Sequence, residues 1–107
     1  METIIVYKKE FENEIDKLLK ILFLNNYFGF EETAFRYVEK IYDFIKVNIS
    51  KPISRSTPKA LSKFGKKFIK YKANNNTSWY IFFDQKDNKF LVNHIINNHS
   101  QDFPDLL

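Results

Sequence analysis

The sequence contains no cysteine. A chain without thiols cannot form a disulfide framework, a thiolate zinc site or a cysteine nucleophile, and its composition fits a reducing compartment. Histidine is scarce as well, because only His94 and His99 occur, five positions apart. No acidic residue keeps a ligand-like spacing with this pair, so the sequence predicts no metal site.

Glycine and long apolar runs are also in short supply. The two glycines are too few for a phosphate-cradling loop, and no nucleophile elbow is present. No apolar run approaches the roughly 20 residues that a membrane helix needs. Residues 1–14 lack the basic-then-apolar layout of a signal peptide. We therefore expect a soluble cytoplasmic protein that needs no cofactor.

Aromatic and basic residues, in contrast, are plentiful. The chain has 107 residues, 44% of them hydrophobic, with 12 phenylalanines and 6 tyrosines. This is enough for one core, and we expect a single domain over residues 1–107. The formal net charge is +4, and residues 59–72 contain six lysines and no acid. Such a distribution favours an anionic partner.

The spacing of apolar residues predicts six elements in the order β-α-α-β-β-β. Residues 9–24 carry one apolar helical stripe, and residues 27–49 hold a second helix that starts near Gly29, Glu31 and Glu32. Strands are expected at residues 3–8, 66–73, 78–83 and 89–97. The expected architecture is α+β, with two antiparallel helices packed on one face of a mainly antiparallel four-stranded sheet.

The proline-containing stretch between the second helix and the next strand is the clear loop. Thr57 is expected to act as N-cap of one short turn, with Pro58 at its first position and Gly65 at its end. Four apolar residues outside the sheet are expected to pack onto the core: Leu61, Phe64, Phe103 and Leu106.

The face of the sheet without helices is expected to be free for function. Alternation places Lys70 and Lys72 on this face together with Lys66 and Phe68, which makes a row of lysines. A row of this kind binds phosphates, but it is equally typical of a solvated edge strand that lysines protect from aggregation. Both interpretations need the same residues.

Polar side chains collect where the last strand ends, at Asn97, Asn98 and His99. Strict alternation along this strand puts Val92, His94 and Ile96 on one face. A histidine near a strand end is more often structural than functional. Beside amides, lysines and aromatic rings, however, the mixture suits a ligand that carries phosphates and stacking bases.

Three stretches of the chain belong together: the string Leu61–Phe64–Gly65, the strand Trp79–Phe83 and the strand Phe90–His99 with its terminal histidine. In this order they resemble the RelE/ParE toxin superfamily. The resemblance covers the whole chain and implies the toxin of a type II toxin–antitoxin system. Many members of this superfamily cut messenger RNA in the ribosomal A site, whereas members of the ParE type poison DNA gyrase. The implied partners are a cognate antitoxin, encoded next to the toxin, and the ribosome with its mRNA.

The resemblance also assigns roles to residues of this chain. His99 would be a general acid or base, and Lys70 and Lys72 would hold phosphate. Arginines usual in the family fall at Tyr80 and Ser100, so Arg55 is the candidate guanidinium. The catalytic set is therefore His99, Lys70, Lys72 and Arg55. The remaining expected RNA-binding residues are Lys66, Lys67, Tyr80, Asn97 and Asn98.

Three functions remain open from the sequence. The first is a metal-independent endoribonuclease, in which the RNA 2′-hydroxyl attacks the adjacent phosphate and His99 and the cations assist. The second is a toxin that inhibits gyrase without chemistry, which the missing arginines favour. The third is an inactive binding module of the same fold, whose lysines only keep the protein soluble.

Overall fold

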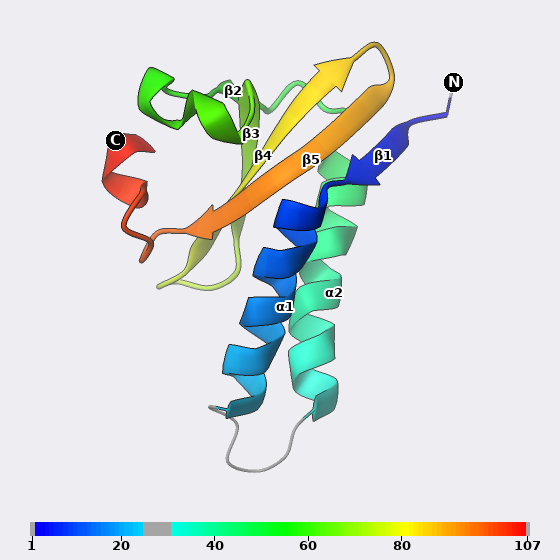
Figure 1. The fold of residues 1–107 in the computed structure, drawn as a ribbon. Helices are drawn as coiled ribbons and strands as arrows, with labels where there is room; N and C mark the ends of the chain where they lie inside the picture. The colour runs from blue at the N-terminus through cyan, green and yellow to red at the C-terminus, as the bar shows by residue number, and fades with distance from the viewer. Residues whose placement is uncertain (1, 25–30, 107) are drawn as a thin grey trace.

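Two long helices and a five-stranded sheet make up the fold of the computed structural model (Figure 1), which describes residues 2–24 and 31–106. The helices are α1 (Lys9–Leu24) and α2 (Glu31–Asn48). The strands are β1 (Ile4–Tyr7), β2 (Arg55–Ser56), β3 (Lys67–Lys72), β4 (Ser78–Lys86) and β5 (Lys89–Asn97). Two short 3-10 turns complete it, η1 (Lys59–Phe64) and η2 (Phe103–Leu106).

The strands lie in the order β1-β5-β4-β3-β2. β1 runs parallel to β5, and the other neighbours are antiparallel, so the sheet is mixed. The predicted α+β class is confirmed, but the predicted count of four strands is wrong. The additional strand is β2, whose two residues pair with Phe68 and Lys67 of β3. Two residues are too few to produce an alternating pattern, and these lie in the segment that the sequence marks as a loop.

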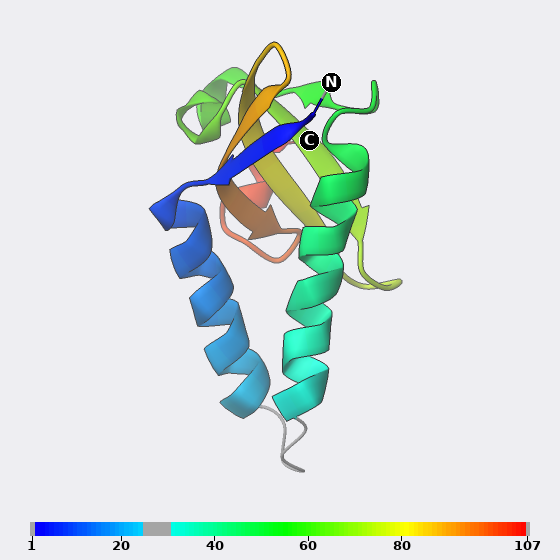
Figure 2. The same cartoon turned by 90° about the vertical axis from the view of Figure 1, so that its right-hand side faces the viewer.

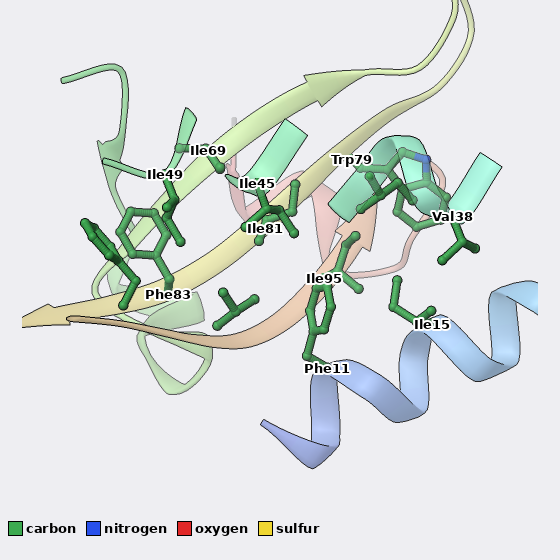
Figure 3. Packing of buried hydrophobic residues seen from close by; sticks show 13 residues of the cluster. Phe11, Ile15, Val38, Ile45, Ile49, Ile69, Trp79, Ile81, Phe83 and Ile95 are labelled. Carbon is green, nitrogen blue, oxygen red and sulfur yellow. The ribbon is translucent and has the colours of Figure 1, made fainter. Parts of the chain in front are cut away.

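Both helices pack on one face of the sheet. They run side by side in opposite directions (Figures 1 and 2), as the sequence predicts. Figure 3 shows the core between helices and sheet, to which α1 contributes Phe11 and Ile15 and α2 contributes Val38 and Ile45, with Ile49 just past the end of α2. In the described residues, no helix combines the length and the apolar character that crossing a membrane requires.

A β-bulge interrupts the pairing of β4 with β5. Phe82 lies opposite His94, but its neighbour Phe83 lies opposite Val92, so Asn93 is the extra residue. As a result Val92 packs on the helix side of the sheet, whereas His94 stacks on Phe64 on the opposite side. The expectation that Val92 and His94 share a face is therefore wrong, because one inserted residue reverses the alternation.

The second face of the sheet is covered in part rather than open. η1 and η2 lie over it, where Leu61 is part of a second apolar cluster and Phe64, Phe103 and Leu106 pack against that cluster, as predicted for these four residues. That cluster consists of Leu61 with Phe68, Tyr80, Phe82 and Ile96. A freely exposed functional face is thus ruled out, and the accessible sites lie at the margins of the two turns.

The start of η1 differs from the expected cap. Pro58 is the N-cap residue, with no side-chain capping hydrogen bond. The Thr57 hydroxyl is buried and finds no hydrogen-bond partner in the part of the chain that the structure describes. The end follows the prediction, since Gly65 closes the turn at φ 141°, a conformation that favours glycine. The predicted helix start at Gly29 lies outside the described residues.

Candidate functional site

A hollow of about 460 Å³ opens between strands β2, β3 and β4 on one side and the C-terminal turn η2 on the other. The residues around it come from four separate parts of the chain. They are Ile53, Arg55, Phe68, Lys70, Tyr80, Phe103 and Leu106. Three of these seven, Arg55, Lys70 and Tyr80, are site residues that the sequence predicts.

Strand register explains why these three residues meet. Arg55 lies directly opposite Phe68, and Lys70 lies directly opposite Tyr80. Residues opposite each other in neighbouring strands share a face, and Phe68 and Lys70 share one because they are two positions apart. All four side chains therefore point to the face that η2 partly covers. The two cationic side chains are exposed, whereas Tyr80 is only 8% exposed.

Aromatic rings form the floor of the hollow. The ring of Tyr80 lies 5.6 Å from that of Phe103 and 6.0 Å from that of Phe68, measured between centroids. The Lys70 Nζ lies 6.0 Å from the centroid of the Tyr80 ring. Burial raises the pKa of the Tyr80 hydroxyl, so this group stays protonated at neutral pH and acts as a donor.

The hollow combines two chemical properties that a nucleotide would use. Arg55 and Lys70 supply positive charge for a phosphate, and the rings beneath them supply surface on which a base can stack. The seven lining residues include neither a carboxylate nor an imidazole. The hollow therefore offers charge and proton donors, but no group that accepts a proton at neutral pH.

His99 does not line this hollow. Its Nε2 donates to the backbone carbonyl of Asn76, 3.1 Å away, in the turn between β3 and β4. Asn98 joins the same turn to the end of β5, because its Nδ2 also donates to Asn76 (3.0 Å) and its Oδ1 accepts from the Ser78 N–H (3.0 Å). Asn97 accepts the backbone N–H of His99 at 2.8 Å. The amide and imidazole cluster thus fastens the connection between β3 and β4 to the end of β5.

The other predicted residues are distributed along the sheet. Lys72 lies at the end of β3, opposite Ser78, outside the hollow. Lys67 begins that strand at its opposite end, and Lys66 precedes it. The Lys66 N–H donates to Asp84 (2.9 Å), and the Lys67 Nζ lies 3.5 Å from the Gln85 side chain. The structure therefore brings together Arg55, Lys70 and Tyr80, and it separates them from the rest.

Trp79, the neighbour of Tyr80 in β4, is not part of the hollow. Trp79 belongs to the helix-side core, is 7% exposed, and donates its Nε1–H to the Tyr37 hydroxyl at 2.9 Å. Phe103 and Leu106 instead provide the apolar wall of the hollow. The sequence indicates that both pack onto the core, but nothing in their spacing identifies them as neighbours of Arg55.

The part of the chain that forms the hollow is positively charged. No acidic residue occurs between Asp43 and Asp84, a stretch that includes β2, η1 and β3. Within residues 2–24 and 31–106, no three metal-ligating side chains gather as a metal site. No known protein family, no curated protein and no solved structure matches the chain.

Proposed function

We propose that the protein is the toxin of a type II toxin–antitoxin system and that it acts on messenger RNA at the ribosome. The observation that carries this proposal is the convergence of Arg55 and Lys70 on a hollow with an aromatic floor. Cations above stacked rings suit a single-stranded nucleic acid, whose phosphate and base need different surfaces. The sequence resemblance to the RelE/ParE superfamily supports the choice of RNA as the ligand.

In this proposal the hollow holds the phosphate at the scissile bond. Cleavage without a metal uses the neighbouring 2′-hydroxyl as nucleophile, and negative charge then grows on the phosphorane oxygens. Arg55 and Lys70 would neutralise that charge, a type of contribution whose removal typically costs about 10²–10³ in rate. The base next to the phosphate would stack on Phe103, whose ring is partly exposed and packs on the buried Tyr80, and this contact would fix the RNA chain for attack.

The hollow lacks one of the two groups that general acid–base cleavage of RNA needs. The Lys70 ammonium and the Tyr80 hydroxyl can donate a proton to the leaving 5′-oxygen, but no lining residue can take the proton of the 2′-hydroxyl. Free protein would therefore cleave RNA slowly. We expect rapid cleavage only when the ribosome orders the mRNA and supplies a further functional group.

The proposal also names a partner and a location. The cognate antitoxin would be an acidic protein encoded beside the toxin, because the stretch from β2 to β3 carries only positive charge. Toxin, antitoxin and ribosome would meet in the cytoplasm. No cofactor is required for the proposed cleavage.

A transcript map after a brief induced pulse of the protein tests the proposed function. Wild-type protein should produce new ends inside translated frames, and the variant Arg55→Ala/Lys70→Ala should produce none. Lys72→Ala is the matched control, because it removes a lysine from the same strand but not from the hollow. The cuts should persist with Lys72→Ala and with His99→Ala. Their loss with His99→Ala alone would move the chemistry to the β5 end and refute the role of the hollow.

The missing proton acceptor favours a second candidate, a toxin that inhibits DNA gyrase by binding alone. In that case the induced protein would stop growth with intact transcripts and would trigger a DNA-damage response. The same pulse experiment separates the two candidates, because transcript ends and the damage response are read from the same culture.

A further inference from the structure

A second and larger concavity lies beside the bulge of β5, between η1 and α1. Its volume is about 720 Å³, within the range of small-molecule sites. None of its lining residues belongs to the Arg55 hollow. Its wall on the sheet side includes Ser62, Lys63, Phe64, Gly65, Asn93 and His94. We call this concavity the bulge groove.

The wall of the bulge groove contains a buried amide held in one orientation. Asn93 is 9% exposed, and its Nδ2 donates to the Asp84 Oδ2 at 2.9 Å. The other oxygen of Asp84 accepts the Lys66 backbone N–H at 2.9 Å. Gly65 presses against the same amide, since a Cβ at that position would lie 2.9 Å from the Asn93 Nδ2. The amide nitrogen must face Asp84, because a carboxylate can only accept.

The consequence is an acceptor without a donor. The Asn93 Oδ1 is buried and has no hydrogen-bond partner among the residues that the structure describes. An unpaired buried acceptor costs about 1–3 kcal/mol, and in a native protein it calls for an explanation. Asn93 lines the groove together with Ser62 and Lys63, which are exposed. Because the Oδ1 is closed to solvent, a ligand that pairs with it must displace neighbouring side chains.

Next to this acceptor lies a flat, half-buried aromatic surface. The rings of His94 and Phe64 stack with centroids 4.1 Å apart and an interplanar angle of 22°. One ring therefore supports the other, and both residues line the groove. Burial lowers the pKa of His94, so its imidazole is neutral at pH 7.

A cation lies close to this surface. The Lys63 Nζ is 5.1 Å from the centroid of the Phe64 ring. Further out, the mouth carries both lysines and carboxylates of α1, of which Lys17 and Glu14 pair at 3.2 Å. The groove as a whole is therefore close to neutral, and the charges that act on His94 are those of Lys63 and Lys17 together with the carboxylates of Glu14 and Asp102.

We propose that the bulge groove binds a nucleotide whose base stacks on His94, donates an amino N–H to the Asn93 Oδ1 and places its phosphate at Lys63. Planar ring, donor and anion are the three features that the groove complements, and a nucleoside monophosphate with an exocyclic amine has all three. The site involves no residue of the Arg55 hollow and does not depend on RNA cleavage.

Because the Asn93 Oδ1 needs a hydrogen-bond donor, the site should prefer bases that carry an amino group. Adenine presents its amine outward at the base edge, whereas inosine carries a carbonyl oxygen at the same position. That oxygen would face the Asn93 Oδ1, acceptor against acceptor. AMP should therefore bind more tightly than IMP, by about 10-fold for the absence of one hydrogen bond to a buried acceptor.

An NMR titration of the isotopically labelled full chain with AMP and IMP tests the proposal. The expected result is a saturable AMP-dependent shift of the His94 ring signals and of the Asn93 side-chain amide, with the preference over IMP. The absence of saturable shifts at millimolar AMP would overturn the proposal. Shifts confined to Lys70 and its neighbours would also overturn it, since they would place the nucleotide in the other hollow.

The AMP affinities of four variants show whether binding depends on stacking, on charge or only on an intact fold. His94→Ala should weaken AMP binding about 10-fold, in line with the loss of one base–aromatic stack. His94→Phe keeps a flat ring and should stay within about 3-fold of wild type, which controls for loss of structure. Lys63→Ala should weaken AMP but not adenosine, and Lys70→Ala should change neither. Equal weakening of AMP by His94→Ala and Lys70→Ala would contradict the assignment.

Discussion

At the scale of single residues, the two histidines have different environments although they lie five positions apart. His94 is half-buried against Phe64, and His99 is exposed with its Nε2 on the Asn76 carbonyl. The sequence draws attention to His99, because it ends an apolar strand among amides. Its neighbour His94 looks like an ordinary strand position until the bulge turns it out of the helix-side core.

His94 makes stability depend on pH. In the unfolded chain a histidine takes up its proton near pH 6.5, but burial lowers its pKa in the folded state despite the opposing influence of Glu14 and Asp102. Below about pH 6.5 the unfolded state therefore binds more protons, and the contribution of His94 to stability declines as the pH falls. Above that pH the contribution is constant.

The variant His94→Phe tests this effect, because it removes the titrating imidazole and keeps a flat ring. The difference in unfolding free energy between variant and wild type should shift in favour of the variant between pH 8 and pH 5. Urea unfolding at both pH values measures it. A difference that is the same at both would show that the His94 pKa is unperturbed in the fold.

At the scale of elements, one glycine controls the junction between η1 and β3. Gly65 has φ 141°, and a Cβ there would lie 2.9 Å from the Asn93 Nδ2 and 3.0 Å from the Phe83 carbonyl oxygen. Gly65→Ala therefore combines backbone strain with a clash against backbone that cannot move aside. We expect it to lower the unfolding free energy by about 2–4 kcal/mol.

Chemical denaturation measures this loss, with Ser62→Ala as the control in the same turn. Ser62 is exposed, so its substitution should stay within about 0.5 kcal/mol of wild type. If Gly65→Ala were as stable as the control, the close contact between η1 and the bulge would be contradicted.

The turn between β3 and β4 is held in place by hydrogen bonds from the end of β5. Asn98→Ala removes hydrogen bonds to Ser78 and Asn76 and leaves both backbone groups without the Asn98 amide. The expected loss is about 1–3 kcal/mol. Asn75, an exposed residue of the same turn, provides the control, and its substitution by alanine should cost less than about 0.5 kcal/mol.

Thermal unfolding of both variants checks this prediction. Equal stability of Asn98→Ala and Asn75→Ala would show that the amides of β5 do not fasten the turn. Their predicted role in binding RNA would then gain support, because the side chains would have no structural task.

At the scale of the whole molecule, apolar periodicity predicts most of the architecture. The stripe that begins with Phe11 and Ile15 identifies α1, and the continuous apolar run from Trp79 to Phe83 identifies β4 as the central strand. Both signals are local and repeat over several residues. The packing of Phe103 and Leu106 onto the sheet follows from composition in the same way.

The parts that sequence could not predict depend on single residues or on long-range register. β2 has two residues, and the bulge has one extra residue, Asn93. Neither changes the average pattern, yet the bulge decides which face His94 occupies. The hollow joins Arg55, Lys70 and Phe103 from separate segments, and no spacing along the chain marks that convergence.

RNA binding in the Arg55 hollow is tested most directly with purified protein and a short fluorescein-labelled single-stranded RNA, titrated across a range of salt concentrations. Arg55→Ala/Lys70→Ala should weaken binding at least about 10-fold at low salt. It should also lower the slope of log affinity against log salt by about 1.4, or about 0.7 for each RNA phosphate that is no longer neutralised. Lys72→Ala/His99→Ala should bind like wild type. If the two double variants weakened binding equally, the hollow would be no RNA site and the proposed function would be contradicted.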